Sequence, residues 1–186
     1  QEQLDTLVRR LSGEVDVAGH ALRIQVSGGE VIARVKDTDV DAMIVKADLA
    51  LYSAKENGKN GWRLFEMAMD QAFRNRQMMK ADLRHAVETK GLRVVYQPIV
   101  SMETMRIASC EALCRWDHPE IGPISPGVFI PLAEEMGIVS DISTFMLDAA
   151  TAECTKWPDP ISVSVNLSAK DFRNDDVIAK VRNALA

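Results

Sequence analysis

Apolar residues in the first 65 positions follow two patterns, one typical of a helix and the other typical of strands. Between 39 and 57 they recur every three or four positions, which predicts one buried face of a helix that ends before Gly58. Short apolar runs around this stretch favour strands, and the first two of these runs form a hairpin signal. The expected elements are the end of an amphipathic helix at 1–11, strands at 14–17, 21–26, 31–35 and 62–65, and the helix at 39–57. Together they predict a small α+β unit.

The stretch 67–89 contains no Gly or Pro and carries a partly apolar stripe at helical spacing. At 1.5 Å per residue, a helix of this length extends on the order of 30 Å. We interpret it as a connecting helix that stops at Gly91. From the pattern alone, an ordinary core helix of a single domain is an equal alternative.

After Gly91, strand-like runs alternate with helix-like stretches. The expected strands are 92–100, 105–116 and 161–167, and the expected helices are 126–136, 138–157 and about 175–186. A loop rich in Gly and Pro separates the second strand from the first of these helices. This alternation predicts a mostly parallel sheet, either open or closed into a barrel.

Composition and charge narrow the classes of partner. The chain has 186 residues, and its 27 acidic and 22 basic residues give a formal net charge of −5. Because these charges are interspersed, the sequence lacks the basic face that binding to duplex DNA or RNA requires. A small anionic ligand held by a few cations stays open. No apolar run approaches the roughly 20 residues that span a bilayer, and no secretory signal opens the chain, so we expect a cytoplasmic protein, whose membrane anchors, if any, lie in other segments.

Three cysteines, Cys110, Cys114 and Cys154, show no paired spacing. The first two lie in a strand-like apolar run. We therefore expect buried thiols of a reducing compartment rather than a zinc site, which needs partners at ligand spacing.

Alternation in the strand 105–116 places Glu111, Leu113 and Arg115 on one face. A carboxylate suits a hard divalent cation, and a guanidinium suits a phosphate through its planar fork. The alternative from spacing alone is a salt bridge between Glu111 and Arg115 at the strand edge.

Two further polar residues stand near the ends of predicted strands. Asn166 lies at the carboxyl end of the predicted strand 161–167, where α/β barrels place reacting groups, so its amide oxygen could reach a metal. Its alternative role is to cap a turn or the next helix. Gln97 near the end of the strand 92–100 could hydrogen-bond a polar ligand or simply satisfy local backbone.

Several of these residues belong to ordered blocks that resemble EAL domains. The blocks are YQPIV at 96–100, EALCRW at 111–116 followed by His118-Pro119, GPISP at 122–126, FIPLAEE at 129–135 with Gly137, and VNLS at 165–168. Upstream, ADLALY at 47–52 with Ala54-Lys55 and Gly58-Lys59-Asn60 is similar to the closing helix of GGDEF domains. The two resemblances together cover nearly the whole chain, as a GGDEF–EAL tandem.

The EAL resemblance implies a phosphodiesterase that hydrolyses cyclic di-GMP to linear pGpG on a modified TIM barrel, with Mg²⁺ or Mn²⁺ as cofactor. By the same resemblance, Glu111 and Asn166 are metal ligands and Arg115 holds a ligand phosphate. Gln97 and Leu113 line the dinucleotide pocket. Metal ions would lower the pKa of a bound water and neutralise charge on the attacked phosphodiester.

The resemblance also implies that both domains are incomplete here. It divides the chain into the C-terminal part of a GGDEF domain (1–66), a connecting helix (67–90) and the N-terminal part of an EAL domain (91–186). The EAL family's later ELTE and DDFG blocks do not occur before Ala186, and a TIM barrel takes about 250 residues, so we expect an α+β end followed by a partial α/β barrel that cannot close. We expect weak metal binding and no efficient hydrolysis by this chain alone.

In the GGDEF part, Lys55 and Lys59 occupy positions that contact nucleotide phosphates in active cyclases, which implies GTP as a ligand of the parent protein. The turn that names the family lies outside this sequence, so the simpler role for both lysines is as cations near a helix C-terminus.

Three hypotheses follow for function. The first is a cyclic-di-GMP phosphodiesterase with an attached GGDEF module. The second is a catalytically degenerate receptor or signalling scaffold that binds the dinucleotide without cleaving it. The third is a fragment that pairs with a second copy through open strand edges.

Overall fold

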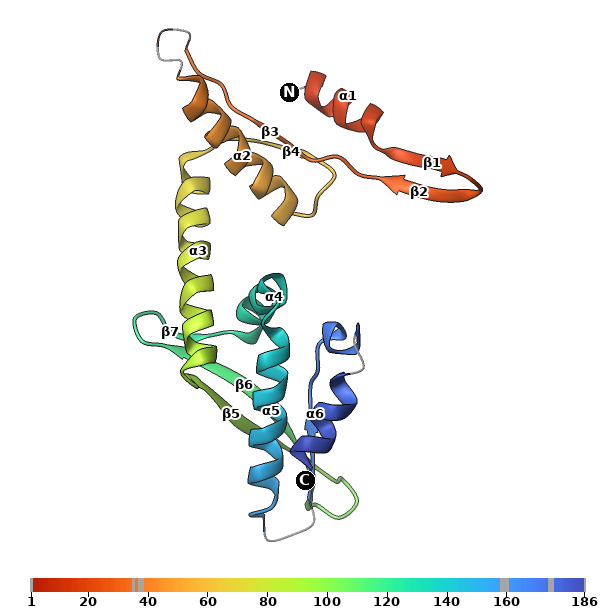
Figure 1. Cartoon of the computed structure of the whole chain (residues 1–186), viewed down its shortest axis with the longest axis vertical. Helices are drawn as coiled ribbons and strands as arrows, with labels where there is room; N and C mark the ends of the chain where they lie inside the picture. Colours follow the sequence, from red (N-terminus) through yellow and green to blue (C-terminus); the bar gives the residue numbers. More distant parts are fainter. Residues whose placement is uncertain (1, 35, 37–38, 158–160, 174–175, 186) are drawn as a thin grey trace. The chain divides into compact units, whose positions relative to one another are not determined.

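The computed structural model describes residues 2–34, 36, 39–157, 161–173 and 176–185, and these form two compact units, Gln1–Gln77 and Met78–Ala186 (Figure 1). The boundary falls inside one helix, α3. The elements of the first unit are α1 (Glu2–Leu11), β1 (Gly13–Val17), β2 (His20–Ile24), β3 (Gly28–Glu30), α2 (Val40–Glu56), β4 (Trp62–Leu64) and the beginning of α3 (Met67–Glu88).

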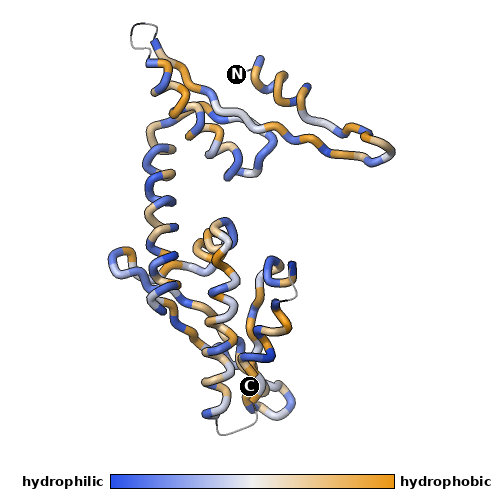
Figure 2. The backbone as a smooth tube through the Cα atoms, in the orientation of Figure 1, coloured by the Kyte–Doolittle hydropathy of each residue, from blue (hydrophilic) through white to orange (hydrophobic). Residues whose placement is uncertain are grey.

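Most elements of the first unit form where the local sequence predicts them. Strands β1 and β2 pair antiparallel around Ala18-Gly19, which confirms the hairpin. Helix α2 begins after Asp39, whose carboxylate accepts the N–H groups of Asp41 and Ala42, as an N-cap residue does. Most of the apolar residues of the hairpin are exposed and colour it as hydrophobic in Figure 2.

The third strand is the exception, because the prediction of a strand at 31–35 is wrong. The structure places β3 at Gly28–Glu30, outside that range; residues 31–34 are not in a strand, and residue 35 lies outside the described residues. Strand β3 pairs parallel with β4. A Cβ atom at Gly29 would lie 2.0 Å from the carbonyl oxygen of Ala47 and 2.4 Å from the nitrogen of Leu51, so the strand forms where only glycine lets it approach α2.

The second unit contains one open sheet around the long strand β6. Its elements after α3 are β5 (Leu92–Val100), β6 (Ile107–His118), β7 (Gly122–Ile124), α4 (Pro126–Met136), α5 (Val139–Cys154), β8 (Ser162–Val165), the 3-10 helix η2 (Ala169–Arg173) and α6 (Asp176–Ala184). Strand β5 pairs along one edge of β6, whereas β7 and β8 pair with different parts of the other edge. Among the described strands this sheet does not close.

The expectation of a mostly parallel sheet is wrong for these strands. Strands β5 and β7 run antiparallel to β6, and only β8 runs parallel to it. The reason is connection length: the short turn 101–106 joins β5 to β6 as a hairpin, whereas β6 reaches β8 through α4 and α5, as a parallel crossover requires.

Strand β7 is a further difference from the sequence-based expectation, which is a loop over this Gly-Pro stretch. Helix α4 begins as its sequence indicates: Ser125 accepts the N–H of Gly127, Pro126 occupies the first turn, and Gly137 ends the helix with φ 75°.

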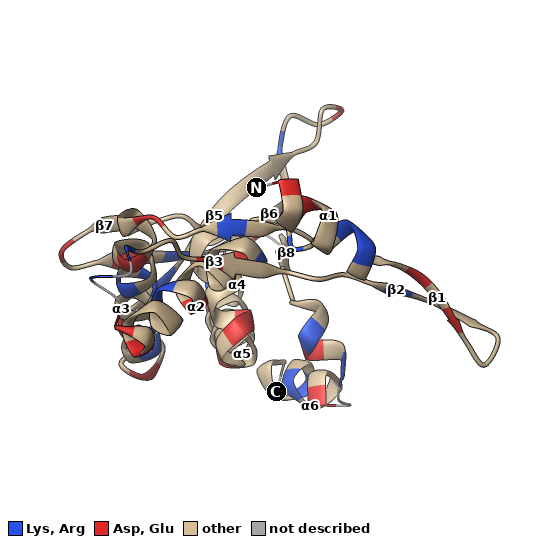
Figure 3. Cartoon of the chain, turned by 90° about the horizontal axis from the view of Figure 1, so that it is seen from above, with Lys and Arg blue, Asp and Glu red and all other residues tan. Residues whose placement is uncertain are grey.

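The core of the second unit lies between β6 and helices α3, α4 and α5. Its largest fully buried side chains are Trp116, Phe129, Leu83 and Leu132. Helices α1 and α6 each carry acidic charge in the first turn and basic charge in the last turn, so both signs of charge occur on one element (Figure 3).

Candidate functional site

Strand β6 separates a buried face from a more open one. Ala112 and Trp116 are 1% and 2% exposed and pack in the core, with Cys114 between them. Glu111 and Arg115 alternate with these residues and are only partly buried. The predicted division of this strand into two faces is therefore confirmed.

Strand pairing adds neighbours on the open face. Gln97 of β5 stands directly opposite Glu111 in the antiparallel ladder, and Ser164 of β8 stands opposite Glu111 in the parallel one. Residues directly opposite each other share a face of the sheet. Asn166 follows two residues after Ser164, at the carboxyl end of β8, and is exposed like it.

Glu111 and Asn166 are in direct contact. The Asn166 side-chain N–H donates to Oε1 of Glu111 over 2.7 Å, across residues 55 positions apart in sequence. The carbonyl oxygen of the same amide has no hydrogen-bond partner among the described residues. A carboxylate from the middle of β6 and an amide oxygen from the carboxyl end of the parallel strand β8 thus stand side by side.

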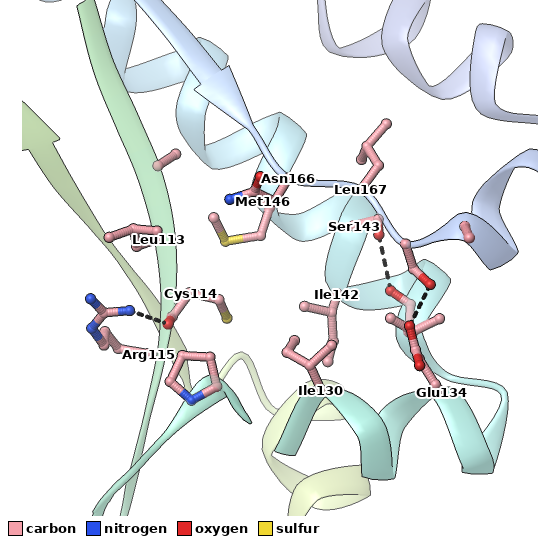
Figure 4. A pocket seen from close by; sticks show the side chains of 15 residues that line it. Leu113, Cys114, Arg115, Ile130, Glu134, Ile142, Ser143, Met146, Asn166 and Leu167 are labelled. Carbon is pink, nitrogen blue, oxygen red and sulfur yellow. Dashed lines mark hydrogen bonds between the residues drawn. The ribbon is translucent and has the colours of Figure 1, made fainter. Parts of the chain in front are cut away.

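Arg115 lies farther along the same face. Its Nη1 donates to the carbonyl oxygen of Cys114 over 2.8 Å. No ion pair between Arg115 and Glu111 occurs among the described residues, so the salt-bridge alternative is not formed. In Figure 4, Leu113 and Arg115 point to one side of β6 and Cys114 to the other.

A pocket of about 340 Å³ opens beside these residues. Leu113, Arg115 and Asn166 line it together with side chains from α4 and α5, among them Ile130 and Glu134 (Figure 4). Glu111 and Gln97 do not line it. Three of the five residues predicted for the EAL site therefore line one pocket, whereas Glu111 and Gln97, on the same open face of the sheet, do not.

Sequence reasoning missed the polar residues around the chain that follows Asn166. The hydroxyl of Ser168 donates to Oε1 of Glu134 over 2.6 Å, and its N–H donates to the buried carboxylate of Asp171 over 3.0 Å. Ser168 and Glu134 belong to the FIPLAEE and VNLS blocks and could have been singled out there. Asp171 carried no signal in the sequence.

In the first unit, the two predicted phosphate-binding lysines lie at the end of α2. Lys55 occupies its last turn and Lys59 follows the helix with φ 58°, and both are exposed. Both lysines thus lie close to a helix C-terminus, the place of their simpler alternative role.

The cysteines are free thiols, as expected, but differ in burial. Cys110 and Cys114 are buried, whereas Cys154 is only partly buried, so the prediction for Cys154 is wrong. It ends α5 and donates its thiol to the carbonyl oxygen of Ile161 over 3.3 Å. Burial raises the pKa of the Cys114 thiol from 9.0 to about 11, with a smaller opposing effect of Arg115.

The donor set fits a hard divalent cation in chemistry but supplies few ligands. Carboxylate and amide oxygens are what Mg²⁺ and Mn²⁺ prefer. Within the described part of the chain, no group of three or more His, Cys, Asp or Glu residues gathers to hold a metal. Glu111 and Asn166 would therefore be two ligands of a shell that other groups complete.

The sequence of the chain is similar to those of known proteins. The chain is 40% identical over 179 residues to the uncharacterized protein y4lL of Sinorhizobium fredii, covering 96% of this chain and 22% of that protein. It is 35% identical over 185 residues to the bifunctional diguanylate cyclase/cyclic di-GMP phosphodiesterase MucR of Pseudomonas aeruginosa, covering 97% of this chain and 27% of MucR. The chain thus spans about a quarter of the length of these curated relatives.

A solved structure, the PaMucR phosphodiesterase in complex with c-di-GMP, superposes with a TM-score of 0.54 at 38% identity, over 58% of this chain and 45% of that one. None of the described helices combines the length and apolar character needed to cross a membrane. The family model for the EAL domain matches residues 80–186, more than half of the chain. The chain therefore belongs to the EAL domain family.

Proposed function

We propose that the protein to which this chain belongs hydrolyses cyclic di-GMP to linear pGpG by metal-assisted attack of water on a phosphodiester bond. The observation that carries the proposal is the 2.7 Å contact between Asn166 and Glu111 beside a pocket lined by Arg115. It joins a cation-binding pair to a phosphate-binding group within one end of the sheet.

Glu111 and Asn166 are the proposed ligands of Mg²⁺ or Mn²⁺. Both offer oxygen atoms of the kind these ions prefer, and both are reachable from solvent. When bound, such an ion lowers the pKa of a coordinated water and offsets charge on the phosphodiester. The Asn166 N–H that donates to Glu111 keeps the carboxylate oriented beside the amide oxygen.

Arg115 is the proposed phosphate-binding residue. Its Nη1 is engaged with the backbone of Cys114, which fixes the guanidinium near the pocket and leaves its other N–H groups for an anion. Leu113 offers the pocket an apolar wall for a nucleobase. Gln97, opposite Glu111, is proposed to hydrogen-bond the dinucleotide from the open face of the sheet.

Similarity to relatives supports the same substrate. MucR is named as a bifunctional diguanylate cyclase/cyclic di-GMP phosphodiesterase, and its solved phosphodiesterase structure holds c-di-GMP. The alignment with MucR extends over 97% of this chain. It supports assigning 1–66 to the C-terminal part of a GGDEF domain, 67–90 to a connecting helix and 91–186 to the N-terminal part of an EAL domain.

Two finer proposals concern the first unit and self-association. Lys55 and Lys59 are proposed to contact the phosphates of GTP in the complete GGDEF domain. Pairing of two copies is supported by the exposed apolar residues of the β1–β2 hairpin, such as Val15 and Leu22. Light scattering after size exclusion tests the pairing: a monomer at all concentrations would remove it.

The hydrolysis experiment uses the complete protein, cyclic di-GMP and Mg²⁺, with pGpG quantified by chromatography. Glu111→Gln keeps the shape of the side chain but removes its charge, so turnover should be lost. The matched control is Glu103→Gln in the exposed turn 101–106, which should leave turnover unchanged. Unchanged turnover in Glu111→Gln would refute the assigned metal role.

The receptor function remains the second candidate, because the described residues provide only two hard ligands and no larger acidic cluster. Calorimetry with cyclic di-GMP separates the two. Binding of the dinucleotide with no pGpG at any Mg²⁺ or Mn²⁺ concentration would replace hydrolysis by the receptor function.

A further inference from the structure

Asp171 is a buried carboxylate with a full set of donors. The residue is 5% exposed, and it lies in the short helix η2 that follows Asn166. The hydroxyl of Ser140 donates to Oδ1 over 2.8 Å, and the hydroxyl of Ser143 donates to Oδ2 over 2.7 Å. The ammonium group of Lys180 lies 3.9 Å from Oδ1. These partners compensate a charge that would otherwise be costly to bury.

The same carboxylate also holds the chain directly after the proposed metal ligand. Oδ2 of Asp171 accepts the N–H of Ser168 over 3.0 Å, and the N–H of Asp171 donates back to the carbonyl oxygen of Ser168 over 3.0 Å. The Ser168 hydroxyl donates to Glu134 of α4 over 2.6 Å. Ser168 is therefore fixed to η2, and through Asp171 and Glu134 to α5 and α4.

Asn166 lies between two fixed points. On one side, Val165 pairs with Ala112 in the parallel ladder of β6. On the other side, Ser168 is held by Asp171. Only Asn166 and Leu167 lie between these anchors, so the direction of the Asn166 side chain depends on both.

We infer that Asp171 is a positioning residue: through Ser168, it holds Asn166 against Glu111 and so preassembles the proposed metal-ligand pair. Asp171 itself does not contact either ligand among the described hydrogen bonds. The inference rests on the proposed function only where it calls Glu111 and Asn166 metal ligands. The position of the Asn166 side chain can be measured without any metal. Groups that orient metal ligands in this way typically change metal affinity about 10- to 100-fold when removed.

The test follows the side-chain amide of Asn166 by NMR in the uniformly labelled chain, with its signals assigned by their loss in Asn166→Asp. In Asp171→Asn, an NH₂ group replaces one of the two carboxylate oxygens. In the place of Oδ2 it would face the Ser143 hydroxyl and the Ser168 N–H, and in the place of Oδ1 it would face the Ser140 hydroxyl. The Asn166 amide signals should then move toward the positions of a freely hydrated amide. The matched control is Asp141→Asn, an exposed aspartate in the first turn of α5, which should leave those signals in place.

A milder variant separates positioning from folding. Ser168→Ala removes the two bonds of the hydroxyl, which donates to Glu134 and accepts the N–H of Lys170, and keeps the backbone N–H bond to Asp171. It should shift the Asn166 signals partway, while the circular dichroism spectrum stays that of the wild type. If Asp171→Asn does not fold, Ser168→Ala together with Ser143→Ala decides the question. Asn166 signals that do not move in any folded variant would overturn the inference.

Manganese binding, measured by electron paramagnetic resonance, distinguishes this failure from failure of the proposed function. If wild type binds Mn²⁺, Asp171→Asn should weaken binding about 10-fold or more. Equal affinities in wild type and Asp171→Asn would overturn positioning and leave the function standing. Shifted Asn166 signals in a protein that binds no Mn²⁺ would support positioning and count against the metal site.

Discussion

The Nε2 atom of His118 lies 3.2 Å from Oδ2 of Asp82, so the end of β6 is tied to helix α3. The other ring nitrogen, Nδ1, accepts the backbone N–H groups of Glu120 and Ile121 over 3.1 and 3.2 Å. Because Nδ1 is an acceptor, the hydrogen of the neutral ring is on Nε2 and is donated to Asp82. His118 is 8% exposed, so a buried side chain holds the turn between β6 and β7 by accepting two of its backbone N–H groups.

We therefore expect His118→Ala to lower the free energy of unfolding by about 2 to 3 kcal/mol, because a buried imidazole is removed and two backbone N–H groups lose their acceptor at a partly buried site. His118→Asn should cost less. Its side-chain oxygen can replace Nδ1 as the acceptor for the turn, although the bond to Asp82 is lost. Urea titration followed by circular dichroism measures both variants.

The matched control for this prediction is His85→Ala, which removes an exposed imidazole from α3. It should change the free energy of unfolding by less than about 0.5 kcal/mol. Equal losses for His118→Ala and His85→Ala would mean that the turn does not need its internal acceptor.

Gly29 gives a second prediction, because its backbone lies against α2. An added Cβ would stand 2.0 Å from a backbone oxygen and 2.4 Å from a backbone nitrogen, which no side-chain rotation can relieve. Gly29→Ala should therefore destabilise the first unit by roughly 3 kcal/mol, at the upper end for overpacking. Gly13→Ala, where the added Cβ meets nothing within 4 Å, is the control for denaturant titration. Similar midpoints for the two variants would contradict the close approach.

These contacts show what periodicity could predict and what it could not. The helices α2 and α3 and the two faces of β6 follow from local repeats, because the spacing of neighbouring apolar residues indicates which face is buried. The contact of Asn166 with Glu111 follows from the parallel pairing of β8 with β6, which places Ser164 opposite Glu111. The alternation of strands and helices does not indicate which strands pair, so the predicted parallel direction of β5 relative to β6 was wrong.

The features that sequence reasoning missed depend on residues distant in the chain. Strand β3 forms at Gly29 rather than at 31–35 because of Ala47 in α2, and no local pattern records that contact. Asp171 carried no signal in the sequence, because its donors Ser140 and Ser143 belong to another helix. Burial of a polar residue can be predicted only once its partners are placed.

The ends of α4 offer a third prediction from two glycines. Gly137 ends the helix with φ 75°, a conformation that L side chains rarely adopt, so Gly137→Ala should cost about 1 kcal/mol. Gly127 lies in the first turn, where an added Cβ meets Ser125 at an ordinary 3.6 Å. Gly127→Ala should be neutral or stabilise the protein by up to about 1 kcal/mol. Thermal unfolding compares them, and a lower midpoint for Gly127→Ala than for Gly137→Ala would reverse the expected order.

The fourth prediction concerns pH and Cys114. Burial raises the pKa of this thiol to about 11 in the folded chain, against 9.0 for an ordinary thiol. Between these values the unfolded chain has released the proton and the folded chain has kept it, so the free energy of unfolding falls as the pH rises. Below pH 9 this contribution is fully present. For a partly screened group we expect a loss on the order of 1 kcal/mol between pH 9 and 11.

Cys114→Ala isolates this effect, because it removes the titrating group while other high-pH titrations remain in both proteins. Urea titrations at pH 8, 9, 10 and 11 should show a free energy of unfolding that declines more steeply in wild type than in Cys114→Ala. The variant starts lower, since a buried side chain has been shortened, and the two curves should converge as the pH rises. Parallel curves across this range would mean that the folded chain does not retain the Cys114 proton above pH 9.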